Sequence, residues 1–153
     1  MCGVVAVLGK ENASQLVIEG LKKLEYRGYD SAGIASFSQR LLQTIKSEGK
    51  LVNLIEKLDW SMKEKLYFNN FIALGHTRWA THGNISFENA HPLVSENKVA
   101  VVHNGIIENY EILKKDLISL GYNFKSKTDT EVLPHLFMKY IKLGNDFLEA
   151  GRL

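Results

Sequence analysis

In the first third of the chain, uninterrupted apolar runs alternate with a segment in which apolar residues recur at the helical period. The uninterrupted run Gly3–Leu8 predicts a short buried strand, because it is rich in β-branched residues and contains no charge. Between positions 12 and 25, apolar residues recur with the helical period, which predicts a helix with Asn12 as its N-cap. Ile34–Phe37 and Leu41–Lys46 have a short polar connection between them, and they predict a β-hairpin.

Two further strand candidates, in the middle of the chain, end in polar residues. Spaced apolar residues over Leu51–Leu58 first predict a second, short helix. Phe71–Leu74 is a strand candidate that runs into Gly75–Gly83, a polar, aromatic and cationic stretch with the sequence GHTRWATHG. Lys98–His103 is another apolar strand, and it ends at Asn104-Gly105. Because strand ends can hold polar groups rigidly and still leave them accessible, these two ends are candidates for a functional site.

The last third of the chain predicts two helices. Apolar spacing from Ile106 to Leu120 predicts the first, with Gly121 as its C-terminal stop. Thr128–Glu131 has the form of a capping box for the second. Pro134 would fall past the first turn of a helix that started at Thr128, so we expect this helix to begin a few residues later.

The order of these elements indicates an α+β fold. Strands follow one another without an intervening helix, which favours α+β layers over a doubly wound parallel sheet. The 153 residues suit one domain, and the hydrophobic fraction of 45% and charged fraction of 24% are typical of globular proteins. With only two prolines and no low-complexity linker, the sequence shows no domain boundary.

Charge and cysteine content narrow the function classes. Nineteen basic and 17 acidic residues give a net charge of +2 without blocks of like charge, so we expect neither a nucleic-acid nor a membrane partner. A single cysteine cannot form an internal disulfide, and no signal peptide is evident, so we expect a cytoplasmic protein. The histidines between positions 76 and 103 match no metal-binding spacing, and no glycine-rich phosphate loop is present. We therefore expect neither a metal nor another cofactor.

Removal of Met1 would place Cys2 at the amino terminus. A thiol and a free α-amine would then lie on one residue, with reference pKa values of roughly 8.5 and 8. Together they form a nucleophile with its own general base. Position alone also allows another interpretation, in which Cys2 is a small apolar residue at the start of a buried strand.

Four other residues could complete such a site. The side-chain amide of Asn104 and the backbone N–H of Gly105 could form an oxyanion hole, although Asn-Gly is also typical of a plain hairpin turn. Arg78 could bind the α-carboxylate of an amino acid, and Asp129 could accept a hydrogen bond from its α-ammonium group. Taken alone, Arg78 could equally be a surface cation and Asp129 a helix-capping carboxylate.

Four motifs give the chain a family resemblance: Cys2-Gly3, YRGYDSAG at Tyr26–Gly33, HTRWATHG at His76–Gly83 and HNGIIEN at His103–Asn109. With them the sequence resembles the N-terminal glutaminase domain of the glutamine–fructose-6-phosphate aminotransferase (isomerizing) family, the glucosamine-6-phosphate synthases. The resemblance runs from Cys2 to about Ile141. It implies a class II glutamine amidotransferase with the N-terminal-nucleophile hydrolase fold, a four-layer αββα sandwich.

The resemblance also implies a set of catalytic residues. Cys2 would attack the side-chain amide of L-glutamine, with its own α-amine as general base. Asn104 and the backbone N–H of Gly105 would form the oxyanion hole. Arg27 would lie beside the nucleophile and orient it. His91, in an Ala-His-Pro stretch, would be structural.

Substrate-binding residues are implied in the same way. Arg78 and Asp129 would bind the α-carboxylate and α-ammonium groups of glutamine. Thr81 and His82 would assist them from the same loop. Trp79 would belong to the segment that covers the site.

In this family the glutaminase domain continues past position 153, and sugar isomerase domains follow it. Those domains bind fructose 6-phosphate, which accepts the ammonia to give glucosamine 6-phosphate in an enzyme that we expect to be a homodimer. We therefore expect residues 2–153 to form a truncated glutaminase domain with an incomplete sandwich and no sugar isomerase domains. Two alternatives stay open: an inactive fragment, and the glutaminase domain of another class II amidotransferase.

Overall fold

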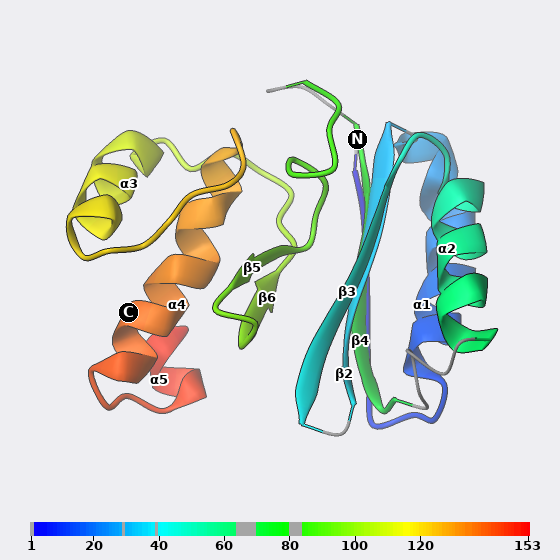
Figure 1. Cartoon of the computed structure of the whole chain (residues 1–153), viewed down its shortest axis with the longest axis horizontal. Coiled ribbons are helices and arrows are strands. Elements are labelled where there is room, and N and C mark those ends of the chain that lie inside the picture. The colour runs from blue at the N-terminus through cyan, green and yellow to red at the C-terminus, as the bar shows by residue number, and fades with distance from the viewer. Residues whose placement is uncertain (1, 29, 39, 64–69, 80–83) are drawn as a thin grey trace.

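The computed structural model describes residues 2–28, 30–38, 40–63, 70–79 and 84–153, with the backbone alone for residues 27, 62 and 63. Figure 1 shows two groups of elements side by side. A long twisted sheet with two helices on its outer face forms one group, and a short two-stranded sheet with further helices forms the other. The two sheets lie between the helices, which produces the layer order of an αββα sandwich.

The larger sheet has four antiparallel strands in the order β1-β4-β2-β3. The strands are β1 (Gly3–Leu8), β2 (Ser31–Ser38), β3 (Leu41–Glu48) and β4 (Ile72–Arg78). The predicted first strand and the predicted hairpin are confirmed, and both hairpin strands are longer than predicted. The predicted end of the Phe71–Leu74 strand is wrong, because β4 continues to Arg78. The polar residues His76 and Arg78 therefore lie within a strand.

Two helices, α1 (Ala13–Leu24) and α2 (Leu51–Lys63), cover the outer face of this sheet (Figure 1). Both were predicted from apolar spacing, and α2 extends past the predicted end at Leu58. Their buried faces pack on alternate strand residues, and each fully buried leucine or isoleucine contributes roughly 1.5–3 kcal/mol. The resulting core comprises Ala13, Val17, Ile18, Leu21, Ala32, Ile34, Leu51, Leu54, Leu58 and Ala73.

The N-terminus of α1 is capped from a distant part of the chain. Asn12 occupies the N-cap position, as predicted, but it has a left-handed conformation and its side chain makes no capping hydrogen bond. Asn70 supplies the acceptors instead. Its backbone carbonyl accepts from the N–H of Ala13 at 3.1 Å, and its side-chain Oδ1 accepts from the N–H of Ser14 at 2.9 Å. This pair of bonds ties the helix start to the segment that leads into β4.

The smaller sheet pairs β5 with β6, and α4 packs against both strands. The elements of this half are β5 (Leu93–Ser95), β6 (Val99–Val101), α3 (Tyr110–Ser119), a 3-10 turn at Asp129–Glu131, α4 (Val132–Lys142) and α5 (Phe147–Ala150). The sequence did not predict β5 or α5. The predicted strand Lys98–His103 is longer than β6 at both ends, and the predicted helix begins at Ile106, four residues before α3. The predicted stop at Gly121 is confirmed, since this residue follows α3 with a φ of +88°.

The start of α4 differs from the predicted capping box. The Thr128 side chain makes no capping hydrogen bond, so the predicted capping box is wrong. The Glu131 carboxylate instead accepts from the backbone N–H groups of Lys125 at 2.9 Å and Ser126 at 2.6 Å. The later helix start is confirmed, because α4 begins at Val132 and Pro134 lies in its first turn.

The α+β class is confirmed, and so is the αββα layer order. The second sheet faces only part of the inner face of the first. Val4 and Leu8 of β1 and Ile72 of β4 point toward that inner face, and they are 41%, 79% and 41% exposed. The β1 edge of the inner face is thus left uncovered by the described residues.

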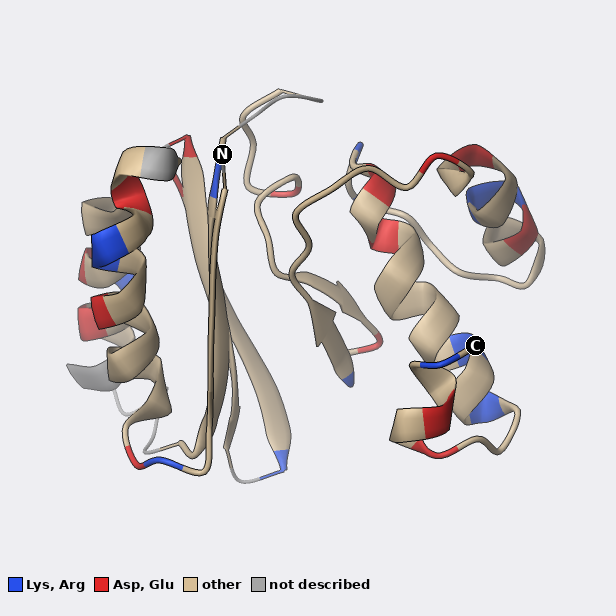
Figure 2. Cartoon of the chain, turned by 180° about the vertical axis from the view of Figure 1, so that it is seen from behind, with Lys and Arg blue, Asp and Glu red and all other residues tan. Residues whose placement is uncertain are grey.

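Charged residues are interspersed along the outer surfaces of the helices. Figure 2 shows lysines and arginines alternating with aspartates and glutamates there, and few charges on the strands. Within the described ranges, no helix combines the length and the apolar character that crossing a membrane requires.

Candidate active site

Cys2 and Trp79 lie beside each other at one end of the large sheet. Cys2 directly precedes β1, Trp79 directly follows β4, and the register of these strands pairs Gly3 with Thr77. The backbone N–H of Trp79 donates to Cys2 Sγ at 3.3 Å, and Sγ lies 3.7 Å from the Trp79 carbonyl oxygen. The thiol is half-buried and forms no disulfide. Strand pairing therefore fixes the position of this thiol against the Trp79 backbone.

Asn104 connects the smaller sheet to the same point. Its Nδ2 donates to the backbone carbonyl of Cys2 at 3.0 Å, although the two residues are 102 positions apart. Its Oδ1 lies 2.8 Å from Nε2 of His76. The next residue, Gly105, has a φ of +152°, and a Cβ there would lie 2.8 Å from the His103 ring. The chain continues from β6 through this loop to α3, so the hairpin interpretation of Asn-Gly is excluded.

His76 is buried in the middle of this contact network. Its side chain is only 1% exposed, and its ring centroid lies 4.4 Å from that of His91. His91 Nδ1 accepts from the backbone N–H of His103 at 3.4 Å. Burial lowers the pKa of His76 to about 4 and the pKa of His91 to about 2. Both rings are therefore neutral at pH 7.

Arg78 and Asp129 come from different halves of the fold: Arg78 belongs to the large sheet, and Asp129 to the 3-10 turn before α4. Arg78, the last residue of β4, is 6% exposed, which excludes the surface-cation interpretation. Burial lowers the pKa of its guanidinium group from the ordinary value, and Cys2 and two carboxylates oppose this shift. Those carboxylates belong to Asp30 and Asp129. Asp129 Oδ2 accepts from the backbone N–H of Ile107 at 2.7 Å, so it anchors the loop after Asn104.

The YRGYDSAG motif packs against the end of β4 through a glycine. A Cβ on Gly28 would lie 3.0 Å from the backbone carbon of Arg78 and 3.1 Å from the carbonyl oxygen of Thr77. The backbone of Arg27, in the 3-10 turn Glu25–Arg27, directly precedes this contact. Its side chain lies outside the described part of the structure. Thr81 and His82, predicted as substrate-binding residues, also lie outside the described residues.

The sequence indicated His76 only as a possible metal ligand, and its contact with Asn104 was not predicted. A strand extended to Arg78 would have indicated the placement, because alternate residues of a strand share one face. Leu74, His76 and Arg78 then point together toward the inner layer. Among the residues with a described position, no group of three or more potential ligands converges in a metal-binding arrangement.

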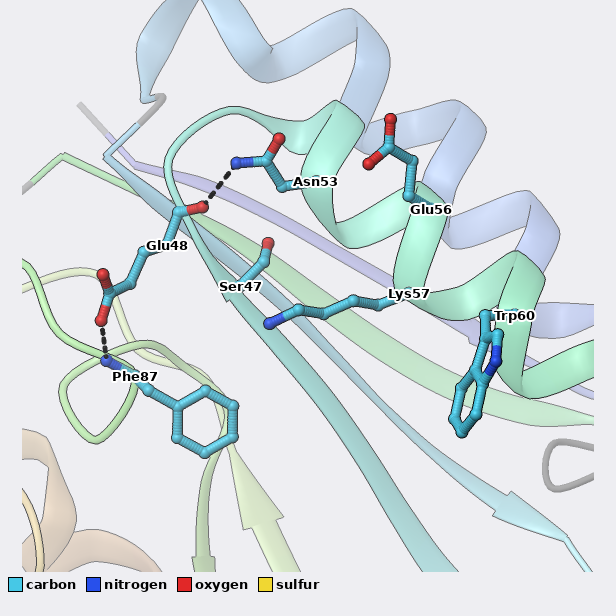
Figure 3. A pocket seen from close by; sticks show the side chains of 7 residues that line it. All are labelled: Ser47, Glu48, Asn53, Glu56, Lys57, Trp60 and Phe87. Atoms are coloured by element: carbon cyan, nitrogen blue, oxygen red, sulfur yellow. Dashed lines mark hydrogen bonds between the residues drawn. The ribbon is translucent and has the colours of Figure 1, made fainter.

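A separate cavity of about 540 Å³ lies at the β3 edge of the large sheet, between β3, α2 and Phe87 of the loop before β5. Figure 3 shows the Lys57 side chain extending from α2 toward β3, and its Nζ donates to the Lys46 carbonyl at 3.0 Å. Trp60 and Phe87 contribute aromatic walls. None of the predicted site residues with a described side chain lines this cavity, so it is separate from the site built around Cys2.

Curated relatives are similar to the chain over nearly its whole length. The glutamine–fructose-6-phosphate aminotransferase (isomerizing) of Clostridium tetani is 53% identical over 151 residues, which is 98% of this chain and 24% of the relative. The enzyme of the same name from Helicobacter pylori is 50% identical over 150 residues, 98% of this chain and 24% of the relative. The chain therefore spans about a quarter of the length of the curated relatives it matches.

Two solved structures share the fold. Glutamine phosphoribosylpyrophosphate (PRPP) amidotransferase from B. subtilis, complexed with ADP and GMP, superposes with a TM-score of 0.72 at 32% identity, covering 91% of this chain and 29% of that chain. A structure described as the allosteric regulatory enzyme of purine biosynthesis has a TM-score of 0.74 at 32% identity, covering 91% and 30%. The predicted N-terminal-nucleophile fold is confirmed by this likeness.

A family model also matches the chain. The model described as the glutamine amidotransferase domain matches residues 59–151, which is more than half of the chain and includes Asn104 and Asp129. With the likeness in fold and the similarity to the aminotransferases, this match shows that the chain belongs to the glutamine amidotransferase domain family.

Proposed function

We propose that this chain is the glutaminase of a glutamine–fructose-6-phosphate aminotransferase and hydrolyses L-glutamine through a thioester on Cys2. The observation that best supports the proposal is the contact between Asn104 and Cys2. An amide donor from the loop that follows the smaller sheet lies against the backbone of the residue that bears the chain's only thiol. Nucleophile and oxyanion donor thus meet within a domain of the glutamine amidotransferase family.

In the proposed reaction, the Cys2 thiol loses its proton to the α-amine of the same residue and attacks the carboxamide carbon of glutamine. The tetrahedral oxyanion accepts hydrogen bonds from Asn104 Nδ2 and the Gly105 N–H. Loss of one such donor typically lowers the turnover number by roughly 10²–10³. The C–N bond breaks as the ammonium group returns the proton to the leaving nitrogen, so ammonia departs. Water then cleaves the thioester, which releases glutamate and restores the thiol.

This mechanism requires that Met1 be removed. In a chain that keeps Met1, the nitrogen of Cys2 is part of a peptide bond and cannot act as a base. We therefore expect such a chain to be inactive, whatever its fold.

Arg78 and Asp129 are the proposed receptors for the α-carboxylate and α-ammonium groups of glutamine. The electrostatic influence of Asp129 and Cys2 on buried Arg78 is consistent with one shared site. In the proposal Thr81 and His82 assist them, Trp79 covers the substrate, and Arg27 orients the thiol.

The acceptor of ammonia is proposed from the names of the curated relatives. In a protein of their length, fructose 6-phosphate would bind to sugar isomerase domains outside these 153 residues and would be converted to glucosamine 6-phosphate. We propose that this longer protein is a cytoplasmic homodimer and that the present chain is the truncated part of its glutaminase domain.

Glutamate release from L-glutamine tests the proposal. Wild-type protein with Cys2 at its amino terminus, verified by intact mass, should release glutamate, and Cys2→Ala should not. Glutamate release at the wild-type rate by Cys2→Ala would end the nucleophile assignment. Wild-type protein that unfolds cooperatively yet neither binds nor hydrolyses glutamine would favour an inactive fragment. In the full-length protein, ammonia transfer to PRPP in place of fructose 6-phosphate would favour another class II amidotransferase.

A further inference from the structure

The side-chain amide of Asn104 is held at both ends. Nδ2 donates to the Cys2 carbonyl at 3.0 Å, and Oδ1 lies 2.8 Å from His76 Nε2. A backbone carbonyl can only accept, so the nitrogen must be the end that faces Cys2. The oxygen end then needs a donor, and His76 is the residue placed to supply it.

The protonation of His76 is set by its surroundings. Only Nε2 faces an acceptor on Asn104, whereas the buried Nδ1 has no hydrogen-bond partner within the described part of the chain. Burial lowers the pKa of the ring to about 4, more than offsetting the opposing influences of the Asn104 side chain and the His103 backbone, so only one ring nitrogen carries a proton at pH 7. The neutral tautomer with its proton on Nε2 satisfies Asn104.

We propose that His76 is a positioning residue that fixes the orientation of the Asn104 amide, so that Nδ2 is directed to the oxyanion of the reaction. The inference rests on the proposed glutaminase function. His76 touches neither glutamine nor the thiol in this scheme, and it acts only through Asn104. Its ring extends from β4 and lies against the ring of His91, with the centroids 4.4 Å apart and the planes tilted by 38°.

Two variants of His76 separate its hydrogen bond from its packing. His76→Phe keeps a flat ring against His91 and removes the donor to Asn104. We expect it to lower kcat for glutamine hydrolysis roughly 10- to 100-fold, less than loss of the whole amide, with KM within about twofold of wild type. His76→Gln keeps an N–H donor and should recover most of the lost kcat. A kcat for His76→Phe within twofold of wild type, or an equal loss in His76→Gln, would overturn the proposal.

A double-mutant cycle with Asn104→Ala provides the decisive comparison. Because His76 acts only through Asn104, adding His76→Phe to Asn104→Ala should lower kcat no further. An undiminished second loss would show that His76 has a general structural role, and it too would overturn the proposal. If wild-type protein shows no glutaminase activity, the proposed function fails first, which distinguishes the two failures.

A measurement without substitution covers the case in which the buried variants do not fold. Nitrogen-15 NMR of the wild-type histidines at pH 7 reports which ring nitrogen bears the proton. We expect Nε2 of His76 to be protonated and Nδ1 to be bare. The opposite tautomer would leave two acceptors facing each other at Asn104, and its observation would overturn the proposal independently of any activity.

Discussion

Gly33 of β2 lies directly against the backbone carbonyl of His91. A Cβ on Gly33 would come within 2.1 Å of that oxygen, a distance at which no side chain fits. Gly33 is also paired with His76 in β4, and the His76 ring lies against the tilted ring of His91. The missing side chain of one glycine thus lets the loop before β5 approach the sheet and support His76.

We predict that Gly33→Ala destabilises the protein by roughly 3 kcal/mol, because the new methyl group would have to displace backbone. Chemical denaturation of wild type and variant measures this difference. Ser36→Ala on the same strand is a matched control. The Ser36 hydroxyl is buried and has no hydrogen-bond partner among the described residues, so its removal should be neutral or slightly stabilising. Equal stability of Gly33→Ala and wild type would contradict the close contact.

Asn104→Ala should lower kcat for glutamine hydrolysis on the order of 10²–10³, because it removes one of two proposed oxyanion donors. KM should change little, since the donor acts on charge that develops in the transition state. Steady-state kinetics with thermal unfolding as a folding control provide the measurement. An unchanged kcat would remove Asn104 from the oxyanion hole.

Arg78→Lys should raise KM for glutamine by roughly 10- to 100-fold. A lysine keeps the positive charge but cannot offer the paired donors with which a guanidinium group binds a carboxylate. The kinetic constants of wild type and variant should differ mainly in KM. A normal KM in a folded Arg78→Lys protein would mean that another group binds the α-carboxylate.

Acid should destabilise the protein in two overlapping pH ranges. Below about pH 6.5 the unfolded chain protonates histidines that burial keeps neutral in the folded state, with pKa values of about 4 for His76 and about 2 for His91. The unfolded state then binds more protons, so the free energy of unfolding falls as the pH falls. Above pH 6.5 these histidines are neutral in both the folded and the unfolded state, so they do not lower the free energy of unfolding there.

The second range belongs to Glu131. Burial alone would raise the pKa of its carboxyl, but the His135 ring, whose Nε2 lies 3.8 Å from Oε1, and hydrogen bonds from backbone N–H groups lower it from 4.5 to about 2. Its stabilising effect is present above pH 4.5 and is lost as the pH falls toward 2. Glu131→Gln should therefore flatten the dependence below pH 4.5 and leave the histidine range intact. Denaturation series from pH 7 to pH 3 test both ranges, and constant stability from pH 7 to pH 4 would contradict the first.

Local sequence signals predicted most elements of the larger sheet and its helices. The β2–β3 hairpin and the helices α1 and α2 follow from apolar spacing, which depends only on neighbouring residues. The cap of α1 could not be predicted in this way, because the acceptor on Asn70 lies 56 positions from Ser14. Glu131 likewise reaches back to Lys125 and Ser126, outside the four-residue box that suggested a cap.

The sequence predicted some, but not all, of the residues that lie together at the candidate active site. Polar residues at strand ends and the motif resemblance pointed to Cys2, Asn104 and Asp129, and the structure brings Asn104 against Cys2. Sequence spacing could not show that His76 supports Asn104, because this contact depends on how the two sheets pack. Strand β5 was missed for a related reason. Its three residues are too few for a clear period, and they are stabilised by pairing with β6.

The central claim, that Cys2 is the nucleophile, is tested most directly by the intact mass of protein quenched in acid during turnover of glutamine. Peptide mapping then locates any acyl group. We predict a glutamyl thioester on Cys2 of the wild-type protein and no adduct on Cys2→Ala. A glutamyl adduct on any other residue, or continued glutamate release by Cys2→Ala, would contradict the claim.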